Sequence, residues 1–546
     1  MTVDETLLQQ ARAWVEQDPD PVTRSELERL VADGDEAELA DRFDGTLEFG
    51  TAGLRGALGA GPNRMNRVVV LRAAAGLAAY LRDQLGDEGG SVVIGYDARH
   101  NSEVFARDTA EVMTGAGLQA HVLPRPLPTP VLAFAIRDLR CAAGVMVTAS
   151  HNPPQDNGYK VYLGDGGQIV PPADEEIAAR IAAVGDVREI PRGDGGEVLT
   201  DELLDRYVDR VVGLAGGGPR DLDLVYTPMH GVGGIVAEAV LRKAGFAAPH
   251  VVTAQAEPDP DFPTTPFPNP EEPGAMDLAM ALAEEVGADL VVANDPDADR
   301  CAVAVPGPHG WQALRGDEVG AILADHLLRL RREGVYATSI VSSSLLGKMA
   351  RAEKQLYAET LTGFKWIGRV PHLAFGYEEA LGYCVDPARV KDKDGISALL
   401  MICDIAARAK RSHKTLRDIL DRLARTHGLH ATDQLSVRVE DLAEIPRLLE
   451  RLRDAAPSSL GGLAVEGVDD LSEGSEHVPP TTGLRFRLAE SSRVVVRPSG
   501  TEPKLKCYLE VVVPVEDDED GVDAARISAA GRLDAIRSDL RAAAGL

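Results

Sequence analysis

Short apolar runs that end abruptly in polar turns are the clearest pattern in the first half of the chain. The run Ala142–Val147 contains no polar side chain, which is typical of a strand buried on both faces. Asn152, Pro153 and Pro154 then end the strand, because proline has no N–H to donate to a neighbouring strand. The pattern therefore predicts that Ser150 lies at the tip of a stiff turn.

Helical and strand-like patterns alternate on both sides of this turn. A helix is predicted at Arg67–Leu85, and strands at Ser91–Asp97, from Leu222, and at Asp289–Asn294. Polar residues gather where these strands end, an α/β layout in which ligands bind at the carboxyl edge of a sheet. A capping-box pattern, Thr23 with Glu26, predicts an additional helix start near the beginning of the chain.

The second half repeats this pattern and then changes. After Arg315 we expect a helix, a short strand at Ser339–Ser344 and loops interrupted by glycine. The last segment predicts an antiparallel α+β domain. Its strand-like runs are Gln434–Glu440, Leu484–Leu488, Arg493–Val496 and Leu505–Val513.

Composition narrows the class of protein. A chain of 546 residues should hold roughly three to five domains. The formal charge of −29 disfavours nucleic acid and anionic membranes as partners, so a phosphate-bearing ligand would need a local cluster of cations or N–H groups. The five cysteines are scattered without metal-binding spacing, and no run of about 18 apolar residues occurs. We therefore expect a soluble, cytoplasmic protein with reduced thiols.

Ser150 is a candidate nucleophile. His151 follows it directly and Lys160 lies ten residues on, so groups able to carry a proton are close in sequence. A plain polar β-turn is the alternative interpretation of Ser-His alone. Motifs further along the chain favour the catalytic interpretation.

Asp295, Asp297 and Asp299 form a candidate metal site. Three carboxylates at alternate positions on a tight turn can converge on one hard cation, which prefers oxygen ligands. An EF-hand is excluded because Arg300 and Pro306 stand where that loop requires Gly and Glu. A small ion such as Mg²⁺ would need further oxygens from water or a phosphate. A solvated acidic loop is the alternative.

Three other segments carry polar groups that could bind an anion or a hydroxyl-bearing ligand. Arg55, in a glycine-rich loop, offers a planar fork of donors to an anion. Glu378 and Glu379 could accept hydrogen bonds from sugar hydroxyls, unless they form an acidic surface turn. The run Arg497–Lys504 combines hydroxyls, exposed N–H groups and two cations, which together make a phosphate nest.

Two segments receive no catalytic role from the sequence. The glycine-rich turn Tyr226–Gly234 is of a kind that can approach a phosphate, but we expect its His230 to be structural. The proline-rich stretch Glu257–Pro273 is predicted to be an ordered loop or lid without assigned chemistry.

Four motifs, TASHNPP…GYK, NDPDADR, GYEEALGY and RPSGTEPK, together resemble the α-D-phosphohexomutase superfamily, most closely its phosphoglucomutase and phosphopentomutase-like branch. The resemblance covers about residue 45 to residue 513. It implies an α/β fold of four domains around a central cleft, three mixed α/β domains and a C-terminal α+β domain similar to the TATA-binding protein. The expected boundaries are 1–215, 216–318, 319–432 and 433–546.

The resemblance also implies roles for individual residues. Ser150 would carry a phosphoryl group, and its oxygen would complete a Mg²⁺ site with Asp295, Asp297 and Asp299. Lys160 would be the general acid/base and His151 an orienting neighbour. Arg300 would screen the charge of the transferring group, whereas Arg55 and Lys365 would have supporting or proton-transfer roles. The loop that grips the non-reacting phosphate would contain Arg497, Ser499, Gly500, Thr501 and Lys504.

The activity implied is that of a phosphoglucomutase, which interconverts α-D-glucose 1-phosphate and D-glucose 6-phosphate through glucose 1,6-bisphosphate. Ala380 departs from the serine that many phosphoglucomutases carry after the paired glutamates, so a phosphopentomutase or phosphomannomutase is an alternative, as is a bisphosphate synthase. A sugar-phosphate phosphatase and a non-catalytic sensor are alternatives from other classes, although a sensor would be expected to have lost Ser150, Lys160 or an aspartate. Small sugar phosphates are the expected partners of a monomer or homodimer.

Overall fold

The computed structural model describes residues 5–51, 53–86, 89–439, 444–475, 478–498 and 504–544. The chain forms two compact units. The first contains Met1–Leu314 and Gly382–Ala407, and the second contains Arg315–Leu381 and Arg408–Leu546. A segment from late in the chain therefore completes the first unit.

The first sheet of the first unit carries the predicted serine turn. Its strand order is β1-β5-β4-β2-β3-β6, with β2 parallel to β3 and β4, and β5 antiparallel to β4. All five residues of β4 are buried, as its apolar sequence predicts. The strands are β1 (Leu54–Ala57), β2 (Ser91–Tyr96), β3 (Gln119–Val122), β4 (Ala143–Val147), β5 (Asp156–Leu163) and β6 (Glu197–Val198).

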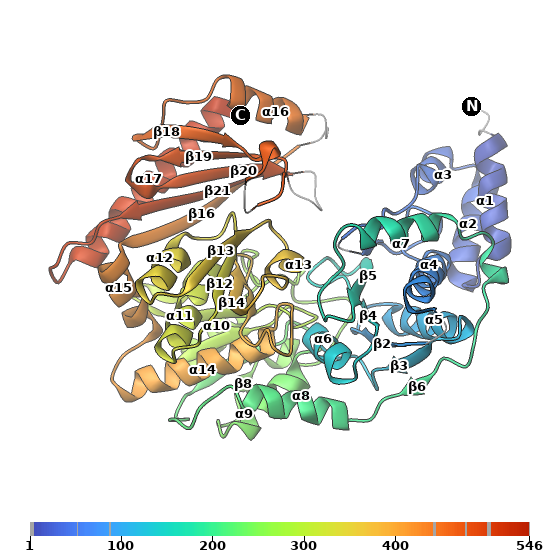
Figure 1. Cartoon of the computed structure of the whole chain (residues 1–546), viewed down its shortest axis with the longest axis horizontal. Helices are drawn as coiled ribbons and strands as arrows, with labels where there is room; N and C mark the ends of the chain where they lie inside the picture. Colours follow the sequence, from blue (N-terminus) through green and yellow to red (C-terminus); the bar gives the residue numbers. More distant parts are fainter. Residues whose placement is uncertain are drawn as a thin grey trace. The chain divides into compact units, whose positions relative to one another are not determined.

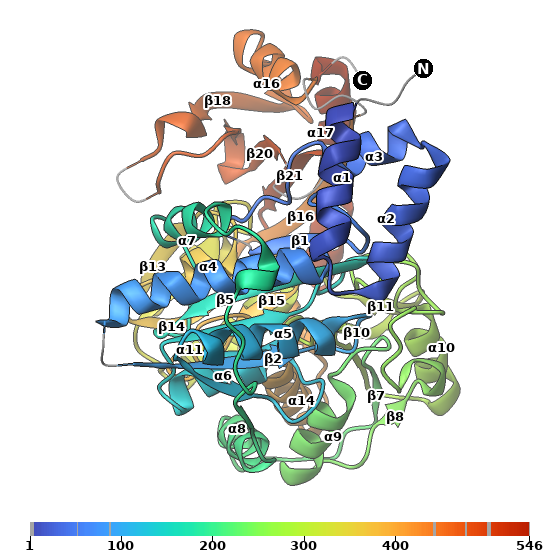
Figure 2. The same ribbon diagram turned by 90° about the vertical axis from the view of Figure 1, so that its right-hand side faces the viewer.

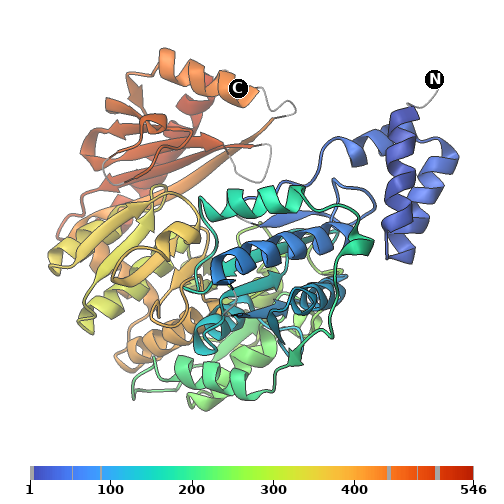
Figure 3. The ribbon, with the colours of Figure 1, turned by 45° about the vertical axis from the view of Figure 1, so that its right-hand side comes forward.

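Helices pack on this sheet and continue beyond it. Helices α4 and α7 run alongside each other (Figure 2), and α6 packs against β2 and β4. The first three helices stand as a small group to one side of the sheet (Figure 3). The helices are α1 (Glu5–Gln17), α2 (Pro21–Asp33), α3 (Glu36–Phe43), α4 (Arg67–Leu85), α5 (Ser102–Gly115), α6 (Thr129–Asp138) and α7 (Ala173–Ala182).

A second sheet in the same unit ends in the acidic turn. Its order is β11-β10-β9-β7-β8, and β9 is parallel to β7 but antiparallel to β10. Its strands are β7 (Leu224–Thr227), β8 (His250–Val251), β9 (Leu290–Ala293), β10 (Ala302–Gly307) and β11 (Gly310–Ala313). The helices are α8 (Glu202–Val212), α9 (Gly234–Lys243) and α10 (Asp277–Val286). The returning segment contributes β15 (Gly382–Cys384), which is not a strand of this sheet, and most of α14 (Gly395–Arg411) to the first unit, and Gly382 forms an isolated bridge to Arg300.

The second unit contains two further sheets (Figure 1). Within this unit, one of them contains parallel strands in the order β13-β12-β14. These strands are β12 (Val335–Ser339), β13 (Leu356–Thr360) and β14 (Leu373–Glu378). The helices of this part are α11 (Gly316–Arg329), α12 (Leu345–Ala352), α13 (Phe364–Ile367) and α15 (Leu416–His427).

The other sheet of the second unit is antiparallel, as predicted for the end of the chain. Its order is β16-β21-β20-β19-β18-β17, and the long helix α17 packs against β16 and β21. The strands are β16 (Leu429–Arg438), β17 (Ser459–Leu460), β18 (Leu463–Asp470), β19 (Leu484–Leu488), β20 (Arg493–Pro498) and β21 (Lys504–Val513). The helices are α16 (Glu444–Asp454) and α17 (Gly521–Ala544).

Two predictions of secondary structure were wrong. Thr23 was predicted to cap a helix, but it lies inside α2, which begins at Pro21, and its hydroxyl donates to Asp18. The side chain of Asp20 caps α2 instead. The strand predicted at Ser339–Ser344 was placed too late in the sequence. Strand β12 ends at Ser339, and the serines that follow lie in a turn. In the part of the chain that the structure describes, no helix has the length and apolar character needed to span a membrane.

Candidate active site

Ser150 lies in a strained turn directly after β4. Its φ angle is 54°, a left-handed conformation that is uncommon for residues other than glycine. Its N–H donates to Oγ1 of Thr148 over 2.9 Å, and that hydroxyl donates to Oδ2 of Asp97 over 2.6 Å. The end of β2 therefore supports the turn through a buried carboxylate.

Arg99 forms hydrogen bonds to the main chain of the same turn. Its guanidinium donates to the carbonyl oxygens of Ser150 over 2.7 Å and of Pro153 over 2.8 Å, and also to those of Asn152 and Asp156. The side chain is buried, so its positive charge is fixed next to the serine turn. Because a guanidinium offers five donors in one plane, it can satisfy several carbonyls that a sharp turn directs inward.

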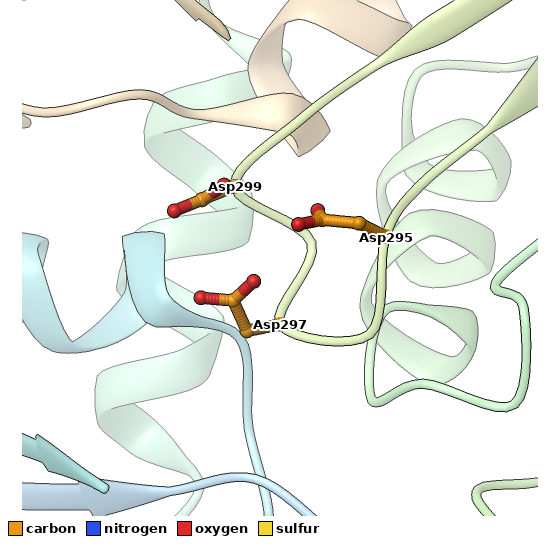
Figure 4. A group of neighbouring side chains, drawn as sticks. All are labelled: Asp295, Asp297 and Asp299. Atoms are coloured by element: carbon orange, nitrogen blue, oxygen red, sulfur yellow. The ribbon is translucent and has the colours of Figure 1, made fainter. Parts of the chain in front are cut away.

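Three carboxylates converge beside Ser150. Asp295, Asp297 and Asp299 follow β9, are fully buried, and have potential ligand oxygens within 4.8 Å of one another. Figure 4 shows their carboxylates facing a common space from one loop. Oγ of Ser150 donates to Oδ2 of Asp295 over 3.0 Å and lies 3.2 Å from Nδ1 of His151. The serine and the acidic turn thus form one cluster, as the sequence predicts.

Two ammonium groups neutralise part of this cluster. Lys160 Nζ donates to Oδ2 of Asp297 over 2.7 Å and to Oδ2 of Asp299 over 3.2 Å, and Lys393 Nζ donates to Oδ2 of Asp299 over 2.7 Å. Burial alone would lower the pKa of Lys160, but the charges of Asp297 and Asp299 outweigh burial and raise it. Burial and the neighbouring carboxylates together raise the pKa of Asp295.

The donor set fits a small hard cation. Oδ1 of Asp297 and Oδ1 of Asp299 are buried and have no hydrogen-bond partner among the described residues. A buried carboxylate oxygen left without a partner is unfavourable, and a divalent cation would satisfy both at once. The residues present are therefore suited to Mg²⁺.

Lys393 comes from the segment that returns to the first unit. Oδ2 of its neighbour Asp392 accepts from Tyr162 Oη and from Gln168 Nε2, each over 2.7 Å. These bonds attach the returning segment to the end of β5 and to the residues after it. The position of the Lys393 ammonium therefore depends on contacts far from it in sequence.

The proline-rich segment 257–273 packs against both parts of the cluster. Phe262 lies under the Arg99 guanidinium, with 4.9 Å from Cζ to the ring centre, and Asp261 contacts Nε2 of His100 over 2.7 Å. Glu271 accepts from Arg300 over 3.3 Å. The segment therefore contacts residues that adjoin the serine turn and the acidic turn.

The glycine-rich turn before α9 contacts the acidic turn. A Cβ at Gly231 would lie 2.3 Å from Cα of Pro296, and the N–H of Val232 donates to the Pro296 carbonyl over 2.8 Å. Only glycine allows this approach of two backbones. Nε2 of His230 contacts Thr264 Oγ1 over 2.8 Å, in keeping with a structural role.

The second unit contains the predicted sugar-binding glutamates. Oε2 of Glu379 accepts from the hydroxyls of Ser339 over 3.1 Å and of Ser342 over 2.9 Å. Oε1 of Glu378 accepts from the N–H of Gly363 over 2.6 Å, two residues before Lys365. Burial, followed by the charge of Glu378, raises the pKa of Glu379. These glutamates are held in place by hydrogen bonds within the unit.

The predicted phosphate loop is described only at its two ends. Arg497 lies near the end of β20 and Lys504 begins β21, and the two strands pair as antiparallel neighbours. Nε of Arg497 is buried without a hydrogen-bond partner in the described part of the chain. Ser499, Gly500 and Thr501 lie outside the described residues. Arg55, in the first unit, donates to Oδ1 of Asn152 over 2.9 Å and so contacts the serine turn.

Comparison with known families accounts for this arrangement. Four domain descriptions of the phosphoglucomutase/phosphomannomutase family match in succession: alpha/beta/alpha domain I at 46–188, domain II at 205–308, domain III at 315–426 and the C-terminal domain at 435–527. The chain belongs to the α-D-phosphohexomutase superfamily. It is a phosphohexomutase enzyme with the four-domain α/β fold expected from its motifs.

Individual relatives of this phosphohexomutase carry different substrate names. A Haemophilus influenzae protein described as a probable phosphomannomutase is 50% identical, covering 82% of this chain and 93% of its own. A Saccharomyces cerevisiae phosphoribomutase is 36% identical, covering 93% of each chain. A Staphylococcus aureus phosphoglucomutase is 33% identical, covering 92% of this chain and 96% of its own. The crystal structure of a phosphomannomutase candidate from Thermus thermophilus, 26% identical, has a TM-score of 0.72 and covers 91% of this chain and 99% of its own.

Two contacts of the phosphohexomutase cluster were not predicted from the sequence. The sequence assigns no role to either Arg99 or Lys393. Both have partners at least 51 residues away in sequence. The polar residues after a buried strand were the available signal for Arg99, whereas Lys393 had no local signal.

Proposed function

We propose that this phosphohexomutase is a phosphoglucomutase that converts α-D-glucose 1-phosphate to D-glucose 6-phosphate through a phosphorylated Ser150. The observation that carries the proposal is the position of Ser150 Oγ, 3.0 Å from Asp295 and 3.2 Å from His151. A hydroxyl beside converging carboxylates and a histidine can accept and return a phosphoryl group once a cation is present.

The reaction would consist of two phosphoryl transfers. In the first, the P–O bond of phosphoserine breaks and a P–O bond forms to a free hydroxyl of the sugar monophosphate, which gives glucose 1,6-bisphosphate. The sugar then turns end for end, and its other phosphoryl group passes to Ser150. Lys160 is the proposed general acid/base: it would donate a proton to the serine oxygen released in the transfer and recover one from the attacking hydroxyl, while His151 would orient the serine oxygen.

Asp295, Asp297 and Asp299 would hold Mg²⁺ together with an oxygen of the phosphorylated Ser150. When bound, Mg²⁺ would neutralise negative charge on the transferring phosphoryl group. Arg300 would add a second positive charge from the same loop. Burial of these groups strengthens each electrostatic interaction relative to water.

Residues of the second unit would bind the parts of the substrate that do not react. Glu378 and Glu379 are proposed to accept from sugar hydroxyls, with Lys365 as a supporting cation. Arg497 and Lys504, with Ser499, Gly500 and Thr501, would hold the non-reacting phosphate. The unsatisfied Nε of Arg497 supports this proposal, because a phosphate oxygen would supply the partner it lacks.

Two observations favour a second sugar. The 50% identity to a probable phosphomannomutase supports mannose phosphates. Ala380, where many phosphoglucomutases carry serine, removes one group that could bind a sugar hydroxyl and supports a pentose phosphate, as does the 36% identity to a phosphoribomutase. Phosphomannomutase and phosphopentomutase are therefore the competing proposals.

The test is to measure kcat/KM for glucose 1-phosphate, mannose 1-phosphate and ribose 1-phosphate in parallel, with Mg²⁺ and the matching bisphosphate. We expect glucose 1-phosphate to be preferred by tenfold or more, which corresponds to about 1.4 kcal/mol of transition-state discrimination. Preference for mannose or ribose 1-phosphate would replace the proposed name with the corresponding mutase.

A parallel assay for inorganic phosphate separates a mutase from a phosphatase. A mutase should release almost none while the sugar phosphate is isomerised. Phosphate released in step with substrate loss would overturn the mutase proposal. Turnover of no sugar phosphate in the presence of bisphosphate would overturn it as well.

A further inference from the structure

Helix α6 begins with a threonine that contacts the acidic turn twice. Oγ1 of Thr129 donates to Oδ2 of Asp297 over 2.7 Å, and the N–H of Thr129 donates to the main-chain oxygen of Asp297 over 3.0 Å. Both side chains are fully buried. In Figure 4 the pale blue chain of the N-terminal segment passes directly beside Asp297.

These two bonds determine which oxygen of Asp297 remains available. Oδ2 accepts from Thr129 and Lys160, each over 2.7 Å, whereas Oδ1 has no partner among the described residues. A carboxylate held at one oxygen and at its main chain cannot rotate freely. Its second oxygen is therefore left for a cation, and Asp297 lies in one group with Asp295 and Asp299, since one ligand atom of each aspartate lies within 4.8 Å of the others.

The position of Thr129 in its helix explains why its hydroxyl donates outward. A buried threonine inside a helix can donate to the carbonyl four residues earlier, as Thr109 does to Phe105 over 2.8 Å. Thr129 is the first residue of α6, so its own helix contains no such carbonyl. An ionised carboxylate is the strongest acceptor that an isolated hydroxyl can meet.

We propose that Thr129 is a positioning residue that orients Asp297 for a divalent cation. The inference rests on the proposed function, because it assumes that the three aspartates bind Mg²⁺. Thr129 belongs to the first sheet domain and Asp297 to the second. The metal site therefore depends on a hydroxyl from a domain that supplies none of its three carboxylates.

The test is to measure Mg²⁺ binding by calorimetry on the full-length protein without sugar phosphate. Thr129→Val keeps the shape and the main-chain bond but removes the hydroxyl, so the Kd for Mg²⁺ should rise about 10- to 100-fold. Thr129→Ser keeps the hydroxyl and should bind within about threefold of the unchanged protein. Thr109→Val removes a buried hydroxyl in the same domain and should leave the Kd unchanged.

The outcomes separate this inference from the proposed function. If the unchanged protein does not bind Mg²⁺, the metal assignment itself is wrong. If it binds and Thr129→Val binds equally well, or Thr129→Ser is weakened as much as Thr129→Val, the positioning role is wrong. Should Thr129→Val fail to fold, Thr129→Ala with the same serine comparison decides the question, with folding checked by circular dichroism.

Discussion

Ser150 has an unusual backbone conformation for a serine, and two kinds of contact maintain it. The positive φ angle is unfavourable in itself, yet the Thr148 hydroxyl and the Arg99 guanidinium satisfy the polar backbone groups of the turn. Strain that is held in place by surrounding bonds is common where a side chain must be presented to a reaction. The turn therefore fixes the serine oxygen before any substrate binds.

We expect Ser150→Ala to abolish turnover while leaving the protein folded. The variant lacks the oxygen that is proposed to carry the phosphoryl group, so kcat should fall on the order of 10⁴-fold or more. It loses only the hydroxyl contacts to Asp295 and His151, which together contribute about 1 kcal/mol. Turnover and the thermal unfolding temperature should be measured on the same preparation. Near-normal turnover would exclude Ser150 as the phosphoryl carrier.

Some residue-scale features could be predicted and others could not, for a physical reason. The three aspartates stand together in sequence after a buried strand, so a local pattern indicated their convergence. Lys393 contacts Asp299 across 94 residues, and Thr129 contacts Asp297 across 168. Contacts of that kind depend on how whole elements pack, and no local pattern of residue types encodes them.

At the scale of elements, close packing of two turns determines the position of the acidic turn. We expect Gly231→Ala to destabilise the first unit by about 1–3 kcal/mol, because the new Cβ would overlap backbone atoms of Pro296, which cannot move aside alone. The displaced turn should also bind Mg²⁺ more weakly. Thermal unfolding and Mg²⁺ calorimetry measure the two effects.

Gly185→Ala is the matched control for that substitution. A Cβ at Gly185 would meet nothing within 4 Å, so the control carries the same change of residue type without the overlap. Equal behaviour of the two variants would show that the contact between Gly231 and Pro296 does not hold the acidic turn.

A second element, the first turn of α11, predicts a pH dependence. Burial, assisted by the charges of Glu379 and Glu510, raises the pKa of Asp317 to about 6. An aspartate of the unfolded chain has a pKa of about 3.9. Between these values the folded protein retains a proton that the unfolded chain has released. The stability of the second unit should therefore fall by up to about 3 kcal/mol as pH rises from about 4 to 6.

We expect Asp317→Asn to remove this pH dependence. Asparagine keeps one oxygen to accept from the N–H of Ser343 and from Tyr377 Oη, and it has no proton to lose. The variant should match the unchanged protein near pH 4 and be the more stable of the two above pH 6. Denaturant unfolding at several pH values measures this, with Asp517→Asn as the control, because Asp517 is exposed in the acidic stretch 516–520. If the free energy of unfolding changed with pH in the same way for Asp317→Asn and for the unchanged protein, Asp317 would not be the source of the pH dependence.

Helices and strands were predicted well where the apolar residues followed a single helical or strand-like periodicity. Helix α4 begins and ends at the predicted residues, and β19 does as well. The strand predicted at Ser339–Ser344 failed because Ile340 and Val341 resemble a strand locally, whereas the serines around them form hydrogen bonds to Glu379 and Glu510. Side-chain bonds of this kind replace the backbone pairing that a strand would need.

At the scale of the whole molecule, the three aspartates proposed to bind Mg²⁺ belong to one unit only. Adding Mg²⁺ at a hundredfold excess over its Kd should stabilise that unit by about 2.7 kcal/mol. Hydrogen exchange followed by mass spectrometry should therefore show greater protection in peptides from residues 5–314. Peptides from 382–407 should show the same increase in protection, although the residues before and after them in sequence belong to the other unit.

The control for this experiment is Asp297→Asn, which should lose the Mg²⁺-induced protection. Equal protection of peptides from 315–381 would contradict the division into two units. The unit division was not predicted from the sequence, because Gly316 and Gly382, which stand where the chain leaves and re-enters the first unit, do not differ from the many other glycines of its loops.

The return of residues 382–407 to the first unit also has a consequence for folding during synthesis on the ribosome. A nascent chain that has left the ribosome as far as residue 314 contains Ser150 and all three aspartates but lacks Lys393 and the strand that bridges to Arg300. The acidic turn is then short of one of its two neutralising ammonium groups. The proposed site can therefore be completed only after Lys393 has been translated, although Ser150 leaves the ribosome much earlier.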